Sequence, residues 1–254
     1  MKSKKIVLSF VCMFMMVLLS ACSGKGEKTG DVPFAEVEKT NPDNSGKTDV
    51  SVTENSKEDT VTEKSESGKI LIAYFSRVGN TDFADDVDAV TSASLLVKDN
   101  RIYGNTQYVA TLVQKAAGGD LFLIETKEKY PSDYDETDKQ GEKENREKAR
   151  PELVSRVENL DEYTTVFLGF PNWYYDMPMA VYSFLEEHDL SGKTIIPFVT
   201  SGGSGFSDAI SAIKELEPDA DVVEDGFETT HSKVDEVTFD EVEAWVNGLG
   251  LEKK

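Results

Sequence analysis

Hydroxyl, amide and glycine residues recur in two short segments whose chemistry suits a phosphate group. Residues 76–81 read SRVGNT and residues 104–106 read GNT. Hydroxyls and backbone N–H groups at the start of a helix hold phosphate, because they donate hydrogen bonds where the helix dipole favours an anion. We predict that a helix starts at the second segment, whose alternative role is only to cap it. The predicted phosphate ligands are Ser76, Asn105 and Thr106, with Arg77, Asn80 and Thr81 as assisting residues.

An aromatic segment, residues 171–178 (PNWYYDMP), is bounded by proline at both ends. A flat, largely apolar ligand needs aromatic side chains to stack on. Trp173 and Tyr174 could provide such a wall, and the backbone of Pro171 and Asn172 could meet a polar edge of the ligand. The alternative is that the two rings fill a core or an interface.

A glycine-rich segment, residues 201–205 (SGGSG), would let the backbone approach a ligand closely, because glycine has no side chain. A rival interpretation is the G-x-S-x-G turn of a hydrolase, but Phe206 stands where the last glycine should be. The triad of a hydrolase would also need a histidine, and His188 is expected at the solvated end of a charged helix. The predicted ligand contacts are Ser201, Gly202 and Gly203.

Apolar runs of strand length alternate with amphipathic stretches along the chain. Runs that are apolar on both faces suit strands of a parallel sheet covered on both sides. This alternation predicts a doubly wound α/β domain, with a five-stranded parallel sheet and helices on both faces. Because ligands bind at the carboxyl ends of such strands, the three loops should meet at one edge. The expected strands are 70–75, 121–125, 166–170, 195–200 and, more weakly, 221–227, and the expected helices are 106–117, 180–187, 207–216 and 239–249, with a solvated helix face over 135–150.

The combination of a hydroxyl-rich, an aromatic and a glycine-rich loop resembles flavodoxins and related FMN-binding domains, over nearly all of residues 69–254. The resemblance implies strand order 2-1-3-4-5 and non-covalently bound FMN, with the phosphate in the first loop and the isoalloxazine ring at the other two. Tyr130 is a further site candidate, since related domains place a Tyr-Pro segment near the flavin. The chain departs from the family where Val78 replaces a hydroxyl and where the helix does not start at Thr81. The intervening residues 82–103 could form a hairpin lid or a surface excursion, and we favour the excursion slightly.

The composition excludes several functions. The 254 residues carry 48 acidic and 27 basic side chains, a net charge of −21, whereas nucleic-acid binding needs a surplus of Lys and Arg. The only cysteines, Cys12 and Cys22, lie near the N-terminus, which excludes a disulfide framework, a cysteine zinc site and a cysteine nucleophile in the body of the chain. Two histidines argue against a multi-histidine metal centre. The acidic surface would steer the domain toward basic partners.

The N-terminal part is expected to direct export of the protein and to tether the domain. Residues 1–22 combine a lysine-rich start with a short apolar run and end in LSAC, which resembles the lipobox of bacterial lipoproteins. Cys22 would then carry the lipid, and the protein would be exported and anchored outside the cell membrane. The alternatives are an ordinary secretory signal or a short membrane anchor. Residues 23–68 have the composition of a disordered tether, which leaves residues 69–254 as the domain.

These observations predict a redox protein that binds FMN and transfers electrons, as flavodoxins do, at the outer face of the membrane. One alternative is an NAD(P)H-dependent quinone or flavin reductase. An alternative of another class is a surface binding module that keeps the fold without flavin. We predict no catalytic side chain and no metal ligand, because the flavin itself would perform the redox chemistry. The redox protein partner or small-molecule oxidant is not identified by the sequence.

Overall fold

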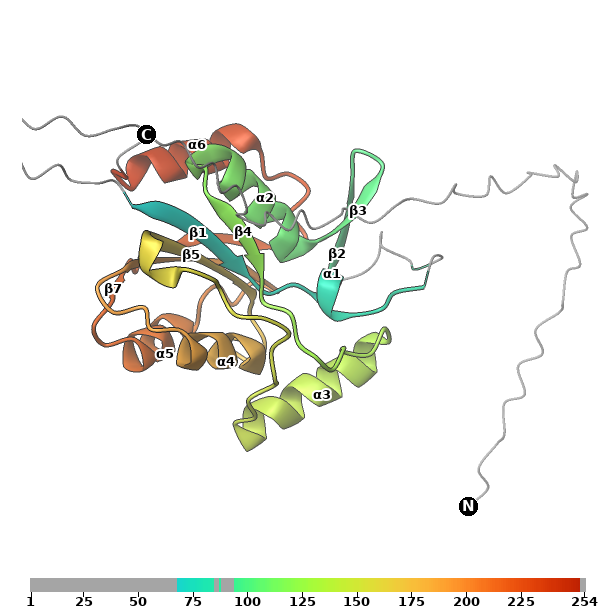
Figure 1. The fold of residues 1–254 in the computed structure, drawn as a ribbon. Coiled ribbons are helices and arrows are strands. Elements are labelled where there is room, and N and C mark those ends of the chain that lie inside the picture. Colours follow the sequence, from blue (N-terminus) through green and yellow to red (C-terminus); the bar gives the residue numbers. More distant parts are fainter. Residues whose placement is uncertain (1–67, 85–86, 88–93, 252–254) are drawn as a thin grey trace, which may run out of the picture. The chain divides into compact units, whose positions relative to one another are not determined.

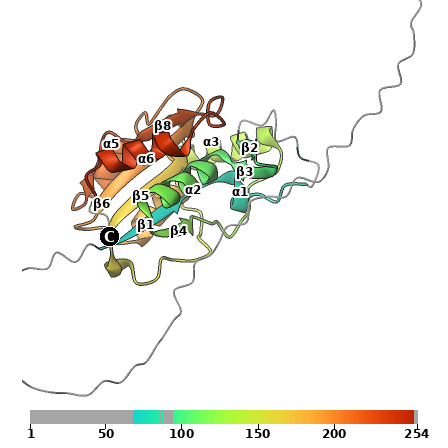
Figure 2. The ribbon, with the colours of Figure 1, turned by 90° about the horizontal axis from the view of Figure 1, so that it is seen from above.

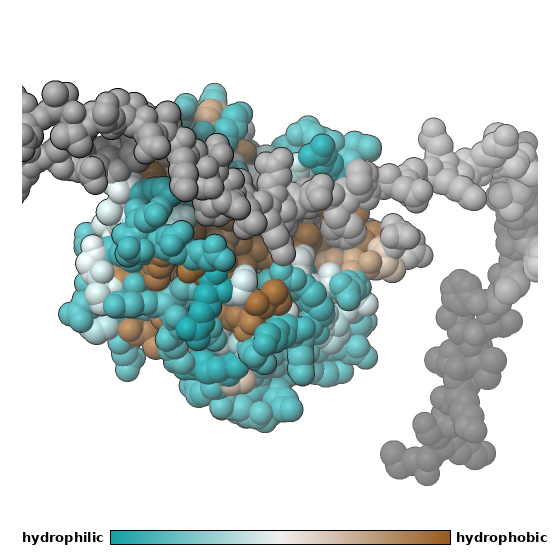
Figure 3. All heavy atoms as spheres, viewed as in Figure 1, coloured by the Kyte–Doolittle hydropathy of each residue, from teal (hydrophilic) through white to brown (hydrophobic). Residues whose placement is uncertain are grey.

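The computed structural model describes residues 68–84, 87 and 94–251 (Figure 1). The predicted signal peptide, with Cys12 and Cys22, and all of the predicted tether except residue 68 lie outside the described residues. Within the described ranges, no helix is long and apolar enough to cross a membrane. The face of the molecule shown in Figure 3 is mostly hydrophilic, in keeping with the high content of acidic residues.

A parallel sheet forms the centre of the domain. Its strands run in the order β4-β1-β5-β6-β7, and β8 also pairs with β6. All of these pairings are parallel, and buried aliphatic residues align across them, as in Leu71 opposite Val166 and Val166 opposite Ile195. In chain order this is the expected 2-1-3-4-5 arrangement, so the predicted fold class is confirmed. The strands are β1 (Lys69–Tyr74), β4 (Asp120–Leu123), β5 (Tyr163–Pro171), β6 (Thr194–Ser201), β7 (Asp221–Val222) and β8 (Phe227–Thr230).

The fifth predicted strand is interrupted. Its two pieces, β7 and β8, pair with different stretches of β6, where Val222 lies opposite Ile195 and Phe227 opposite Phe198. Between the two pieces, Gly226 passes so close to β6 that a Cβ there would lie 2.2 Å from the carbonyl oxygen of Pro197. The prediction of one strand over 221–227 was therefore wrong in its bounds, because the second piece continues to Thr230.

Helices cover both faces of the sheet (Figures 1 and 2). On one face, α2 and α6 pack with Ile72, Phe167 and Phe198 of the sheet. On the other face, α4 and α5 pack with Leu71, Val166 and neighbouring strand residues. The charged helix α3 buries only Thr137 and Gly141, which agrees with its expected solvated face. The helices are α2 (Asn105–Ala117), α3 (Tyr134–Glu147), α4 (Met179–Glu187), α5 (Ala209–Leu216) and α6 (Phe239–Gly248), with a 3₁₀ turn η1 over Leu160–Glu162.

A hairpin joins the first strand to α2. After the single irregular turn α1 (Arg77–Asn80), the described part of the insertion forms the antiparallel strands β2 (Leu95–Lys98) and β3 (Arg101–Gly104). The residues of its tight turn, Asp99 and Asn100, both have positive φ, as short hairpin turns require. Strand β3 leads directly into α2, so the helix starts at the second GNT segment and not at Thr81, as predicted. The described residues of this region thus form a hairpin, and its role as a lid or as a surface excursion stays a prediction.

Candidate functional site

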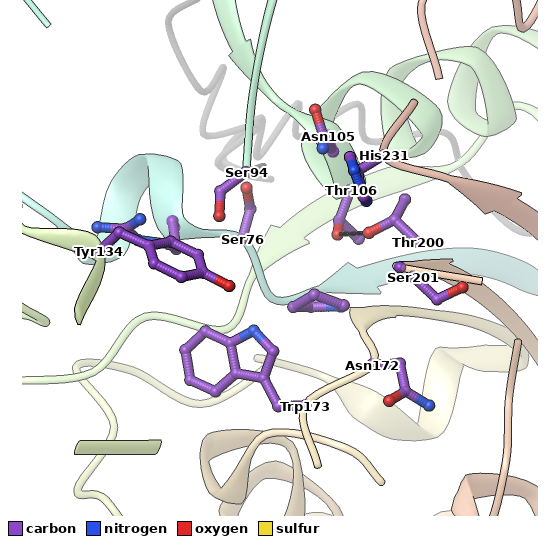
Figure 4. Close-up of a pocket in the computed structure, with 13 residues that line it drawn as sticks. Ser76, Ser94, Asn105, Thr106, Tyr134, Asn172, Trp173, Thr200, Ser201 and His231 are labelled. Carbon is purple, nitrogen blue, oxygen red and sulfur yellow. Dashed lines mark hydrogen bonds between the residues drawn. The ribbon is translucent and has the colours of Figure 1, made fainter. Parts of the chain in front are cut away.

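A cavity of about 190 Å³ lies at the carboxyl ends of β1, β5 and β6. Loops that follow these strands meet there with the first turn of α2, and Figure 4 shows their side chains around the cavity. Most of the residues predicted from the sequence line it. These are Ser76, Arg77, Asn105, Thr106, Pro171, Asn172, Trp173, Ser201 and Gly202.

The start of α2 and the end of β1 form one side of the cavity. Ser76 sits against Gly104, the N-cap of α2, whose N–H donates to Gln107 Oε1 at 3.0 Å. Thr106 shares a hydrogen bond of 2.8 Å with Thr200 at the end of β6. The first turn of α2 contains no acidic residue. Hydroxyl groups and a helix N-terminus therefore face the cavity, which is the donor set that an anion requires.

The structure corrects the assignment of Asn80 and Thr81, which do not line the cavity. The Asn80 amide is fully buried and donates to the carbonyl oxygens of Ser76 and Ile124, at 3.0 and 2.9 Å. Its Oδ1 accepts from the backbone N–H and the hydroxyl of Thr126, at 2.7 and 3.0 Å. Thr81 is buried in a bridge with Tyr130. The polar groups of Asn80 are thus used to fix the ends of β1 and β4, which leaves none for a ligand.

Arg77 is a buried cation at the cavity wall. Its Nη2 donates to the carbonyl oxygens of Pro131 and Ser132 at 2.9 and 3.0 Å, and its guanidinium lies 5.0 Å from the centre of the Phe83 ring. Burial lowers the pKa of Arg77. Among the described residues, no carboxylate forms an ion pair with it, and its Nε has no hydrogen-bond partner. The charge of Asp133 partly offsets the effect of burial on the pKa of Arg77. A buried guanidinium without an ion-paired carboxylate favours an anion in the space beside it.

Trp173 forms an aromatic wall of the cavity and is held rigidly. Its ring makes edge contacts with the rings of Phe75 and Tyr130, each with ring centres 5.4 Å apart and an angle of 82° between the ring planes. These contacts fix the orientation of the indole. On α3, a Cβ at Gly141 would lie only 3.2 Å from Trp173 Cε3, so the helix packs closely against the indole. Tyr130 is buried behind Trp173 and donates to Glu144 at 2.9 Å, so it supports the wall without lining the cavity.

Tyr174 lines a second, adjoining hollow of about 270 Å³. Its hydroxyl bonds to Asp138 on α3, and partial burial together with this bond raises the pKa of Tyr174. Both hollows share six lining residues, so they are parts of one recess. The shared residues are Arg77, Ser94, Tyr134, Asn172, Trp173 and Gly202.

The glycine-rich loop is pinned by its first residue. Ser201 Oγ accepts from the N–H groups of Gly203 and Gly205, both at 3.1 Å. A Cβ at Gly202 would meet no atom within 4 Å, so this backbone faces open space in the cavity. Gly203 instead lines a neighbouring hollow, together with Glu228 and other residues after β6 and β8. The loop therefore meets the cavity through Ser201 and Gly202 only.

A family model described as Flavodoxin matches residues 94–249, which is more than half of the chain. The chain belongs to the flavodoxin family. Among solved structures, candidate flavoproteins of Bacteroides eggerthii and Bacteroides uniformis are 28% and 27% identical to it, with TM-scores of 0.54 and 0.55. The alignments cover 73% and 72% of this chain and 99% of each of those chains. A flavoprotein of Lactobacillus acidophilus, described in complex with FMN, is 18% identical over 66% of this chain and 97% of its own, with a TM-score of 0.46. None of the curated proteins compared with the chain matches it.

Membership of the flavodoxin family supports a flavin cofactor, and the lining residues fit one. The described lining combines hydroxyls at a helix start, an indole wall and an open glycine backbone. The lining of the first cavity includes Arg77 and His231 but no Asp or Glu, and Asp138 lines the adjoining hollow. A phosphate-bearing flavin needs this distribution of donors, apolar surface and charge.

Four lining residues were not predicted from the sequence as ligands: Ser94, Tyr134, Thr200 and His231. Thr200 is the last residue of an apolar run that was assigned to the sheet, so its position at the carboxyl end of β6 was the available signal. His231 follows β8 directly, and it was missed because the fifth strand was expected to end at residue 227. Ser94 lies at the base of the hairpin, and Tyr134 lies at the start of α3. The sequence patterns did not assign either residue to the ligand site.

The structure also corrects the environment of His188. Its ring is buried against Phe184, with ring centres 4.3 Å apart. Its Nε2 accepts from the backbone N–H of Val157 at 3.0 Å, so Nδ1 carries the proton and donates to the Phe184 carbonyl oxygen at 2.7 Å. Burial lowers the pKa of His188. Both ring nitrogens satisfy backbone groups, so the expected solvated histidine is wrong and His188 is no partner for a hydrolase triad.

Proposed function

We propose that the domain binds FMN non-covalently in the recess formed by the two adjoining hollows. This proposal rests on the lining of one cavity. Ser76 at the end of β1 and Thr106 at the start of α2 line the same cavity as the indole of Trp173. A phosphate end and an aromatic end in the same cavity match the two ends of FMN. The family assignment supports a flavin, and the cavity supports its phosphorylated form.

Each part of the recess has a role in holding FMN. Ser76, Asn105 and Thr106 would hold the phosphate together with the first backbone N–H groups of α2. Trp173 would stack against the flavin ring, and the open backbone at Gly202 would approach the polar edge of the ring. Asn172 donates to the carbonyl oxygen of Gly205 at 2.9 Å, which fixes the aromatic loop to the glycine-rich loop.

We propose electron transfer as the role of the protein. When bound, FMN supplies reversible uptake of electrons. The lining residues bind and orient it. The described lining of the first hollow holds no carboxylate, and Asp138, which lines the second, is bonded to the Tyr174 hydroxyl and is not placed as a free general acid or base. This supports a carrier that exchanges electrons with a partner over a reductase with its own substrate. Attachment through a lipid on Cys22 would place this exchange at the outer face of the membrane.

The first test is the visible absorption spectrum of the purified protein. We expect flavin bands near about 375 and 450 nm, and FMN released from the protein by heat. Absence of these bands, even after incubation with excess FMN, would overturn the proposal and leave a flavin-free binding module. If FMN is bound, rapid bleaching by NADPH alone would favour the reductase, whereas no bleaching without a partner protein would favour the carrier.

A further inference from the structure

His231 occupies the end of the cavity where the phosphate would lie. It follows β8 directly, and its backbone N–H donates to the carbonyl oxygen of Ser201 at 2.9 Å, which fixes its position beside β6. Figure 4 shows His231 on the same side of the cavity as Asn105 and Thr106, with Trp173 on the opposite side. The imidazole therefore shares the helix-start end of the cavity and not the aromatic end.

Few ionisable groups face His231 from the elements around it. The residues that α2 and β6 contribute to the cavity carry no charge, and the end of β1 contributes the cation Arg77. The start of α3 contributes Tyr134. A neighbouring hollow shares Ser201 with this cavity. The charged residues that line that hollow are Glu228, Lys233, Glu236 and Glu241.

We infer that His231 recognises the phosphate of FMN and gives the site a preference for FMN over riboflavin. This inference rests on the proposed function. An imidazole N–H donates a hydrogen bond to a phosphate oxygen. No carboxylate in the described lining of this cavity competes for that N–H. The side chain of His231 therefore adds a donor from the end of β8 to those that β1 and α2 supply.

The comparison of FMN with riboflavin isolates this effect, because the two ligands differ only by the phosphate. Two substitutions bracket the wild type. His231→Leu removes the N–H donor, and His231→Lys keeps a donor that can bind a phosphate oxygen.

The experiment measures the dissociation constants of both flavins for the three purified proteins. We expect wild-type protein to bind FMN about five- to tenfold more tightly than His231→Leu, with equal riboflavin affinities. His231→Lys should retain the tighter binding of FMN. Thermal unfolding of each variant verifies that the fold is intact.

Three results are distinguishable from this expectation. If His231→Leu shows the same preference for FMN over riboflavin as the wild type, the inference is overturned. If the substitution weakens FMN and riboflavin equally, His231 contacts the ring or ribityl part and does not read the phosphate. If wild-type protein binds neither flavin, the proposed function itself fails, which is a separate outcome.

Discussion

The hydroxyl of Ser76 occupies the space that a side chain on residue 104 would fill: a Cβ at Gly104 would lie 1.9 Å from Ser76 Oγ. Gly104 has φ −74°, so its backbone is open to any residue and only this approach demands glycine. The contact joins the end of β1 to the start of α2 across the hairpin between them. It is the physical reason that a hydroxyl from the first loop reaches the helix N-terminus.

Gly104→Ala should therefore displace Ser76 and weaken FMN binding by about tenfold, with a loss of about 1–3 kcal/mol in the free energy of unfolding. Gly248→Ala is the matched control, since a Cβ there would meet no atom within 4 Å and the residue lies in α6. The control should leave FMN affinity unchanged. Flavin titration and urea unfolding give both quantities, and equal behaviour of the two variants would contradict the prediction.

Removing the hydroxyl should separate packing from binding. In the double variant Ser76→Ala with Gly104→Ala, the nearest remaining Ser76 atom, Cβ, would be 3.3 Å from the new Cβ, a tight but tolerable contact. We expect most of the lost stability to return while FMN affinity stays low, because the donor for the phosphate is absent. Recovery of FMN affinity together with stability would show that the Ser76 hydroxyl does not bind the phosphate.

Trp173→Ala should weaken FMN binding by about 1–3 kcal/mol, because the ring loses its aromatic wall. Trp173→Phe should retain part of the affinity. Trp245→Phe serves as the control, because Trp245 packs on Phe167 and Phe227 in the core of the opposite sheet face. Quenching of FMN fluorescence measures all three. An unchanged affinity in Trp173→Ala would remove this residue from the site.

The doubly wound α/β class was predictable from apolar runs on both strand faces and helical periodicity between them, whereas the order of the strands was implied by the resemblance to flavodoxins. The start of α2 was predicted to within one residue from the GNT segment and the apolar spacing after it. The prediction erred at Asn80 because residue type alone does not tell whether an amide faces a ligand or the backbone of its own loop. His231 was missed because the break at Gly226, which shifts the end of the last strand, arises from a contact with Pro197 that no local pattern reveals.

Lipid attachment at Cys22 has a direct test in the full chain expressed in a bacterial host. Wild-type protein should incorporate labelled fatty acid and sediment with membranes, whereas Cys22→Ala should lose the label, because the thiol carries the lipid. Cys12→Ala is the control and should behave as the wild type. Labelling that persists in Cys22→Ala would contradict a lipid anchor at this residue.

Glu217, at the end of α5, makes the stability of the domain depend on pH. Burial raises the pKa of Glu217 from 4.5 to about 7. A folded-state pKa above the unfolded value favours the folded protein below about pH 4.5, and this contribution is lost as the pH rises through about 7. At about pH 8, the free energy of unfolding of Glu217→Gln should therefore exceed that of the wild type by about 1–3 kcal/mol, as measured by urea unfolding. At about pH 5 the two proteins should have similar free energies of unfolding. Glu215→Gln, two positions earlier and exposed, should show no such difference between the two pH values. An advantage of Glu217→Gln that is the same at both pH values would mean that packing, and not ionisation, is responsible.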